Sequence, residues 1–390
     1  MRPVVLNKIK GLRVSEKREQ RLAGLDGLRA LAIALVIGFH YFARWTPPLD
    51  TVNRYPYGDA WAHFAPFVYG YLGVNVFFMI SGFVISMTLV RSSNFLNFAY
   101  KRFARLFPSM LLCSTLTYLT LRALPQTAFL RPWWDFLPSL TFTEPYLWSF
   151  LTHRHFASMD GAYWSLVVEV KFYFWIAVLY FGLRARNLYA GASVGFGVLM
   201  VVLFAMHRLA LPHQWVVEDV FVTPYLPWFV AGVGFHALHR GSRYGWVLLA
   251  QALLALSLPG IVDGEPSWPD WIAFAGGSTL FFALLYRPAW VALLAAPALA
   301  GIGEASYSLY LLHQEIGVAV LQLLDRSPFF LAHRWAGAGV AVALALGMAC
   351  LAWSIYRYWE APAKSWLLRL PRSPLIARAG SPVPPVEPGV

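Results

Sequence analysis

The sequence predicts an all-α, polytopic membrane protein with about ten transmembrane helices and both termini in the cytoplasm. Hydrophobic residues make up 58% of the 390 residues and charged residues only 13%, about half the charged share of a soluble domain. This composition excludes a disordered chain and disfavours an ordinary soluble enzyme, because too few polar side chains remain to cover a soluble surface. The apolar residues form long continuous stretches, which disfavours the alternating pattern of a β-barrel.

Ten apolar segments each approach the length of about 20 residues that an α-helix needs to cross the hydrocarbon core. A further apolar segment, residues 288–300, is short and contains two prolines, so we expect an interfacial or re-entrant piece there. The expected spans are residues 28–45, 67–90, 106–124, 163–183, 188–211, 219–239, 244–262, 268–286, 305–324 and 335–358. Gly70, Gly73 and Gly82 are expected to let the second and third spans approach closely.

The distribution of Lys and Arg sets the predicted orientation. With the N-terminus in the cytoplasm, the segments on that side hold nearly three times as many Lys and Arg residues as the external loops. This bias is typical of helical proteins of the cell inner (plasma) membrane, and it accounts for the net charge of +12 without a nucleic-acid partner. No small-residue cleavage site follows the first apolar run, so we interpret it as a span and not as a signal peptide.

Three regions follow from this topology. We expect a basic cytoplasmic tail over residues 1–22, a transmembrane domain over residues 23–368 and a Pro-rich disordered cytoplasmic tail over residues 369–390. Two long external loops, residues 46–66 and 125–162, are rich in aromatic residues. Their rings could stack on an exported acceptor or form the aromatic belt of the membrane interface.

Metal and disulfide chemistry is not expected. The chain has two cysteines, which excludes a disulfide framework or a Cys-rich metal site. His153 and His155 lie in a flexible loop and make a poor metal site. We therefore expect no metal and no permanently bound cofactor.

Ionisable residues inside a span cost about 2.5–3.5 kcal/mol each on insertion scales and are functional candidates by default. Glu169 should face the bundle interior and meet a partner, whereas Lys171 points elsewhere and either snorkels or pairs with another span. His313 could be catalytic or could join helices through a hydrogen bond. The full set is His40, Glu169, Lys171, His207, Arg208, His313 and Glu315.

One spacing predicts chemistry directly. Arg29 and His40 are eleven residues apart, close to three helical turns, so both lie on one helix face about 16 Å apart along the axis. Arg102 and Arg105, on a short amphipathic stretch, either anchor the membrane boundary or join Arg29 in a cytoplasmic anion site, since Arg suits phosphate. An imidazole higher on the same face suits a general base. The spacing therefore favours a phosphorylated donor that reaches from the cytoplasm towards His40.

At these residues the sequence resembles acyltransferase family 3, the multi-spanning membrane O-acyltransferases of cell-envelope glycans and related acceptors. Each motif alone is weak, but six stand in the family's order: Gly24–Ala32 followed by His40, Gly73–Phe83, Arg102–Pro108, Tyr163–Glu169, Ser306–His313 and Glu360–Pro362. Val170 and Lys171 depart from the pattern, because many members have a second acid and a Gln there. Longer members carry a fused periplasmic esterase-like domain, so we expect this chain to act alone or with a separate periplasmic partner.

The resemblance implies transfer of an acyl group, usually acetyl, from a cytoplasmic acyl-CoA (acetyl-CoA) to an acceptor hydroxyl. His40 would correspond to the family's essential histidine, deprotonating the acceptor or, alternatively, carrying the acyl group itself. Glu169 would orient His40 or stabilise its imidazolium. Arg29, Arg102 and Arg105 would correspond to the acyl-CoA-binding arginines. Candidates to line the cavity are Ser81, Trp164, Ser165, Tyr310 and His313.

The acceptor stays open at this stage. The resemblance favours a cell-surface saccharide, such as lipopolysaccharide O-antigen or exopolysaccharide, with a macrolide or a lipid-linked sugar as the alternative. From another class, a proton-coupled secondary transporter would use the buried ionisable residues as a relay. The six ordered motifs and the lack of a detectable inverted repeat disfavour the transporter.

Overall fold

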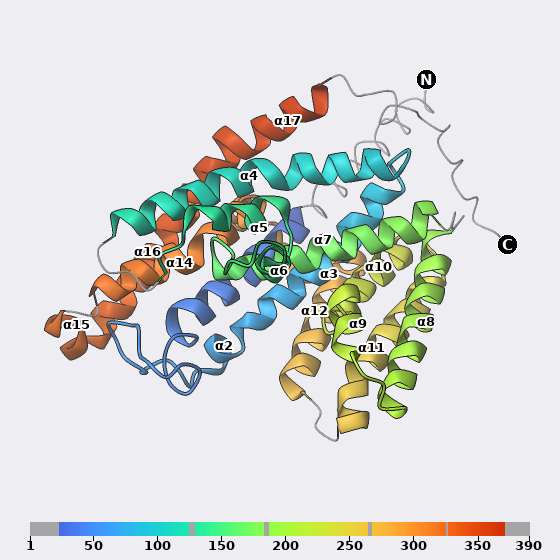
Figure 1. Ribbon diagram of the computed structural model, residues 1–390, viewed down its shortest axis with the longest axis horizontal. Coiled ribbons are helices and arrows are strands. Elements are labelled where there is room, and N and C mark those ends of the chain that lie inside the picture. Colours follow the sequence, from blue (N-terminus) through green and yellow to red (C-terminus); the bar gives the residue numbers. More distant parts are fainter. Residues whose placement is uncertain (1–22, 125–128, 183–186, 264–266, 325–326, 371–390) are drawn as a thin grey trace.

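The computed structural model describes residues 23–124, 129–182, 187–263, 267–324 and 327–370. Within these ranges the chain is helical without strands, and each of the ten predicted segments contains a long helix, which confirms the all-α class (Figure 1). The predicted N-terminal tail, residues 1–22, and all but the first two residues of the predicted C-terminal tail, residues 369–390, lie outside the described residues. The long helices are Ala23–Phe42, α3 (Gly73–Leu89), α4 (Phe95–Ala123), α7 (Trp164–Ala177), α8 (Leu188–Arg208), α10 (Leu226–His239), α11 (Tyr244–Asp263), α12 (Trp268–Tyr286), α14 (Ser306–Leu324) and α16 (Arg334–Ile355).

Six helical runs in the described ranges are long and apolar enough to cross a membrane, or seven if α12 and the element after it form one bent span. The fold is therefore that of a multi-pass membrane protein, but the predicted count of ten spans and the orientation are not confirmed. The long helices outside the six runs include α4, with Arg102 and Arg105 near its start, and α14, with His313 and Glu315 at its centre. Such side chains lower the mean hydropathy of a helix.

Short elements connect the long helices. The chain bends by 101° between α12 and the 3₁₀ helix η5 (Pro288–Ala295), as expected for an interfacial or re-entrant piece, and α13 (Pro297–Glu304) follows. The remaining short elements are α2 (Ala65–Val68), η1 (Gly70–Leu72), η2 (Trp133–Asp135), α5 (Phe136–Thr141), α6 (Pro145–Thr152), η3 (Gly161–Tyr163), η4 (Val178–Gly182), α9 (Gln214–Phe221), α15 (Pro328–Ala332), η6 (Tyr356–Glu360) and α17 (Ala361–Arg369).

The helix α4 begins well before the predicted start at residue 106. The Asn94 side chain caps its N-terminus by accepting a hydrogen bond from the Asn97 backbone at 2.8 Å, which satisfies one of the free N–H groups of the first turn. Arg102 and Arg105 therefore belong to one continuous helix with the apolar span, and the prediction of a separate amphipathic stretch is wrong. One turn apart, the two arginines lie on the same side of α4.

Glycines bring α3 into close contact with two other helices. A Cβ on Gly73 would collide with the Ala32 carbonyl of the N-terminal helix Ala23–Phe42, and a Cβ on Gly82 with the Phe229 carbonyl of α10. Small residues at such crossings let helix backbones approach closely in lipid. The expected contact between the second and third spans is corrected, because the partners of these glycines are the first helix and α10. This packing fixes the position of the N-terminal helix, which carries Arg29 and His40.

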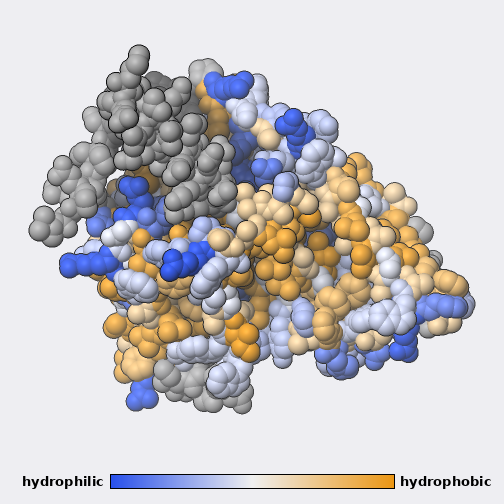
Figure 2. Space-filling model, turned by 180° about the vertical axis from the view of Figure 1, so that it is seen from behind, coloured by the Kyte–Doolittle hydropathy of each residue, from blue (hydrophilic) through white to orange (hydrophobic). Residues whose placement is uncertain are grey.

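The outer surface exposes many large apolar side chains, for example Val198 and Val201 on α8 and Leu346 on α16. Figure 2 shows apolar residues over much of one face, with hydrophilic residues gathered mainly towards its margins. An apolar surface of this extent is unfavourable in water and is the surface that a membrane protein presents to lipid.

Candidate active site

Two cavities inside the bundle share part of their walls. The arginine cavity, of about 130 Å³, is lined by Arg29, Ser81, Arg102, Arg105, Ser165, Glu169, Tyr173 and Tyr310, among others. The histidine cavity, of about 520 Å³, is lined by residues that include His40, Arg44, Trp45, Tyr71, Asn75, Trp164, Asp270, Tyr310 and Gln314. Val74 and Tyr310 line both cavities. The predicted donor-site arginines and the predicted base therefore lie in adjoining spaces.

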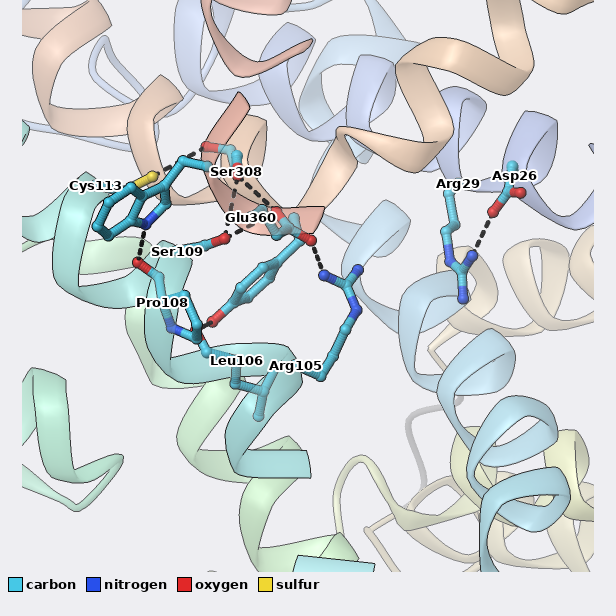
Figure 3. Close-up of polar contacts among 11 residues, drawn as sticks. Asp26, Arg29, Arg105, Leu106, Pro108, Ser109, Cys113, Ser308 and Glu360 are labelled. Atoms are coloured by element: carbon cyan, nitrogen blue, oxygen red, sulfur yellow. Dashed lines mark hydrogen bonds and ion pairs between the residues drawn. The ribbon is translucent and has the colours of Figure 1, made fainter. Parts of the chain in front are cut away.

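A buried carboxylate fixes Arg105. Glu360, which is only 1% exposed, forms an ion pair with Arg105 and accepts hydrogen bonds at 2.8 Å from Ser109 and Ser308. A buried carboxylate without partners would be strongly destabilising, so these contacts hold α4, α14 and η6 together at the edge of the arginine cavity. Figure 3 shows Arg29, from the facing N-terminal helix, with its guanidinium directed into the space between the two helices.

The other two arginines differ in their partners. Arg29 forms an ion pair with Asp26, one turn away on the same helix. Arg102 donates to the Thr88 hydroxyl at 2.8 Å and lies 5.7 Å from the centroid of the Tyr173 ring. Within the described ranges, Arg102 has no acidic partner and its buried Nε has no hydrogen-bond acceptor. Arg102 is therefore the arginine of this cavity with the most unused capacity for an anion.

Glu169 lies in the arginine cavity and not beside His40. Its Oε1 accepts hydrogen bonds from the Ser81 hydroxyl of α3 and the Tyr173 hydroxyl one turn further along α7. The expected contact between Glu169 and His40 is not formed, because α7 turns Glu169 towards α3 in the neighbouring cavity. Through these hydrogen bonds Glu169 positions the Tyr173 ring, which Arg102 contacts in the wall of the arginine cavity.

The partner of His40 is His313 on α14. His40 Nδ1 lies 3.1 Å from His313 Nε2 and 3.0 Å from the Val36 carbonyl oxygen, and His313 Nδ1 lies 2.8 Å from the Tyr310 carbonyl oxygen. Carbonyl oxygens only accept, so the network assigns a proton to Nδ1 of both rings. The one Nδ1–H of His40 is then shared between the Val36 carbonyl oxygen and His313 Nε2, and His40 Nε2 keeps a lone pair. His40 lines the histidine cavity, whereas His313 is fully buried behind it.

The other cavity-lining candidates form the wall between the two cavities. The Tyr310 hydroxyl donates to the Ala162 carbonyl at 3.0 Å and accepts from the Ser165 hydroxyl at 2.8 Å. Trp164 lines the histidine cavity, and Ser81 and Ser165 line the arginine cavity. These hydrogen bonds hold the Tyr310 ring in place where the cavities adjoin.

A cluster of buried acids fixes α14 beside His313. Asp160 accepts hydrogen bonds from the backbone N–H groups of Ala162 at 2.8 Å and Glu315 at 3.0 Å, and Arg131 pairs with Glu315 at 2.9 Å. Burial raises the pKa of Asp160 to about 6. The cluster ties the segment before α7 to the helix that carries His313.

Two further predicted residues lie away from the site. Lys171 pairs with Glu144 at 2.7 Å and Asp219 at 2.9 Å, so it pairs with other segments as one alternative predicted. His207 does not line either cavity but a groove beside α8. The sequence interpretation did not single out Tyr173 or Asp270. Tyr173 carries a readable signal, because it follows Glu169 by four residues and so lies on the same helix face.

Helices with apolar outer faces around two adjoining polar cavities are typical of a multi-pass membrane protein with an internal binding site. The chain belongs to acyltransferase family 3: the family's sequence profile, described as "Acyltransferase domain", matches residues 22–357. The predicted resemblance to this family is therefore confirmed.

Curated relatives agree with the family. The chain is 25% identical over 210 residues to "O-acetyltransferase OatA" of Staphylococcus aureus strain NCTC 8325 / PS 47 and to the protein of that name from strain COL. Each match covers 47% of this chain and 30% of the relative, so the chain matches less than a third of the length of these relatives. No solved structure matches the chain.

Proposed function

We propose that this protein moves an acyl group, most simply acetyl, from acyl-CoA to a hydroxyl of a cell-surface saccharide at the plasma membrane. The observation that carries this proposal is the shared wall of the two cavities. A site for an anion and an imidazole base lie on either side of Val74 and Tyr310, an arrangement suited to a donor with a charged head and a reactive end. The names of the relatives support acetyl as the transferred group.

The donor would enter from the cytoplasmic side. Its phosphates would meet Arg29, Arg102 and Arg105, since guanidinium groups bind phosphate through paired N–H donors. The thioester at the end of its long arm would pass Tyr310 and Val74 to reach His40. Arg102 would contribute most to affinity, because Asp26 and Glu360 already pair with the other two arginines.

His40 would act as general base. Its Nε2 takes the proton from the acceptor hydroxyl while the oxygen attacks the thioester carbonyl carbon. The tetrahedral intermediate then collapses, the C–S bond breaks, and the leaving thiolate takes the proton back from His40. His313 accepts from Nδ1 throughout, which fixes the tautomer and stabilises the imidazolium.

The acceptor would occupy the histidine cavity from the outer side. The rings of Trp45, Tyr71 and Trp164 offer flat faces against which a sugar ring can pack. The side-chain amides of Asn75 and Gln314 can hydrogen-bond the sugar hydroxyls. A separate periplasmic protein could deliver or receive the saccharide.

The test is transfer of radiolabelled acetyl from acetyl-CoA in membranes that contain the protein. The wild type should label a glycan or lipid-glycan fraction, His40→Ala should abolish labelling, and Arg102→Ala should weaken it. Label that stays on the protein without acceptor, and is absent in His40→Ala, would indicate an acyl-histidine step. Retained acyl transfer in a well-folded His40→Ala variant would contradict the role of His40 as general base. Solute flux in liposomes without any acyl transfer would favour a transporter.

A further inference from the structure

A third hollow opens beside the histidine cavity. This apolar groove, of about 470 Å³, lies between α8, α11 and the starts of α10 and α12. Its apolar lining includes Phe196, Leu199, Met200, Leu203, Leu226 and Leu256. The mechanism proposed above does not use it.

The groove and the histidine cavity adjoin. Pro224 and Asp270 line both. The Asp270 carboxylate accepts a hydrogen bond from Asn75, a residue of the histidine cavity, at 3.4 Å, and another from Ser267, a residue of the groove. A ligand that extends from His40 past Asp270 would therefore reach the groove at this junction.

The two hollows suit the two halves of an amphiphile. Asn75, Asp270 and Gln314 can hydrogen-bond sugar hydroxyls. The groove is lined mostly by apolar side chains, with His207, Gln214 and Glu218 among its polar residues, and its apolar part would gain from burying a hydrocarbon chain. A free saccharide would leave the groove unused. A bulk lipid without a sugar would leave the polar junction at Asp270 unused.

We propose that the acceptor is a saccharide joined to a hydrocarbon chain, with the sugar in the histidine cavity and the chain in the groove. This inference rests on the proposed function and names its acceptor class. It also places the reaction in a sequence: glycosyl transfer onto a membrane lipid must supply the acceptor, and acylation precedes any step that detaches the sugar from that lipid.

The test compares acceptor fractions and groove variants. Organic-solvent extracts of cells that make the protein are mixed with the purified protein and radiolabelled acetyl-CoA. Each extract is used either intact or after treatment with mild acid or mild alkali. Mild acid cleaves a sugar from a polyprenyl phosphate, and mild alkali removes ester-linked acyl chains. The intact extract should accept label in an organic-soluble product, and loss of labelling after acid or after alkali identifies the anchor.

Neighbouring residues of α8 supply a matched control. Met200 lines the groove, whereas Val201 is 68% exposed on the outer surface. Met200→Trp should lower transfer to the intact extract at least tenfold and leave acetyl-CoA affinity unchanged, and Val201→Trp should behave as wild type. Leu256→Trp fills the groove from α11 and serves as a second variant if Met200→Trp does not fold.

Two outcomes distinguish failure of the lipid-linked acceptor from failure of the proposed acyl transfer. Transfer only to water-soluble saccharide, equal in wild type and folded Met200→Trp, overturns the lipid-linked acceptor and keeps the acyltransferase. Label in no fraction, with unaltered acetyl-CoA, overturns the proposed reaction and this inference with it.

Discussion

His40 Nδ1 and His313 Nε2 lie 3.1 Å apart, although 273 positions of the chain separate the two residues. The Tyr310 carbonyl accepts from the far nitrogen of His313, so the pair has a direction: His313 accepts, and His40 presents a free Nε2. A neutral acceptor behind the base plays the orienting part that was expected of Glu169.

Removal of that acceptor should slow the chemical step. We expect His313→Leu to lower kcat about 10–100-fold, the kinetic equivalent of a hydrogen bond to a charged group worth about 1.5–3 kcal/mol. The KM for acyl-CoA should stay unchanged, because none of the hydrogen bonds of His313 reaches the donor-site arginines Arg29, Arg102 and Arg105. His313→Gln, whose amide oxygen can accept from His40, should recover part of the rate. An equal loss of kcat in His313→Leu and His313→Gln would show that His313 serves only in packing.

Arg102 should govern donor affinity. We expect Arg102→Ala to raise the KM for acyl-CoA about 10–100-fold with little change in kcat, since a charge-assisted contact to phosphate is lost. The KM of Arg102→Lys for acyl-CoA should lie between those of the wild type and Arg102→Ala. Arg122→Ala, near the other end of the same helix, is the control. An unchanged KM in Arg102→Ala would remove this arginine from the donor site.

Arg105 should matter for stability as well as binding. Arg105→Met leaves the buried Glu360 carboxylate without its cation, which should cost about 3–5 kcal/mol and lower the melting temperature in detergent. Arg105→Met combined with Glu360→Met should recover most of that stability, but not the donor affinity. A double variant with wild-type KM would show that Arg105 serves only to neutralise Glu360.

Glu169→Gln separates the expected role from the observed position. The amide oxygen of Gln can still accept from the Ser81 and Tyr173 hydroxyls, but the loss of negative charge weakens these hydrogen bonds. A weakening of about 1 kcal/mol should change the KM for acyl-CoA about fivefold. If kcat fell to the level of His40→Ala with KM unchanged, Glu169 would act on His40 after all. The steady-state rates of both variants at saturating donor decide between these outcomes.

Asp160 should make stability depend on pH. A carboxyl whose pKa rises to about 6 on folding contributes stability at low pH, and this contribution is lost as pH rises from about 4 to about 6. The melting temperature of the wild type should therefore fall relative to Asp160→Asn over that window and stay level above it. A constant difference between the two proteins from pH 4 to pH 7 would exclude titration of Asp160 there.

The positions of the helices, and the placement of Arg29 and His40 on one helix face, could be predicted from the sequence. Hydropathy located every long helix, and the helical repeat placed Arg29 and His40 on one face, because both are local properties of a continuous segment. Composition likewise indicated a lipid-facing surface. These inferences needed no knowledge of which helices touch.

Only the tertiary structure decided the partners. The sequence favoured Glu169 as the partner of His40 and left the role of His313 open. The glycine contacts of α3 with the first helix and α10, together with the placement of α14, put His313 beside His40 and left Glu169 in the next cavity. The meeting of the histidine cavity and the groove at Asp270 was likewise decided by the tertiary structure. In lipid, every helix can bury an apolar face against any other, so the pattern of one helix does not determine its neighbour.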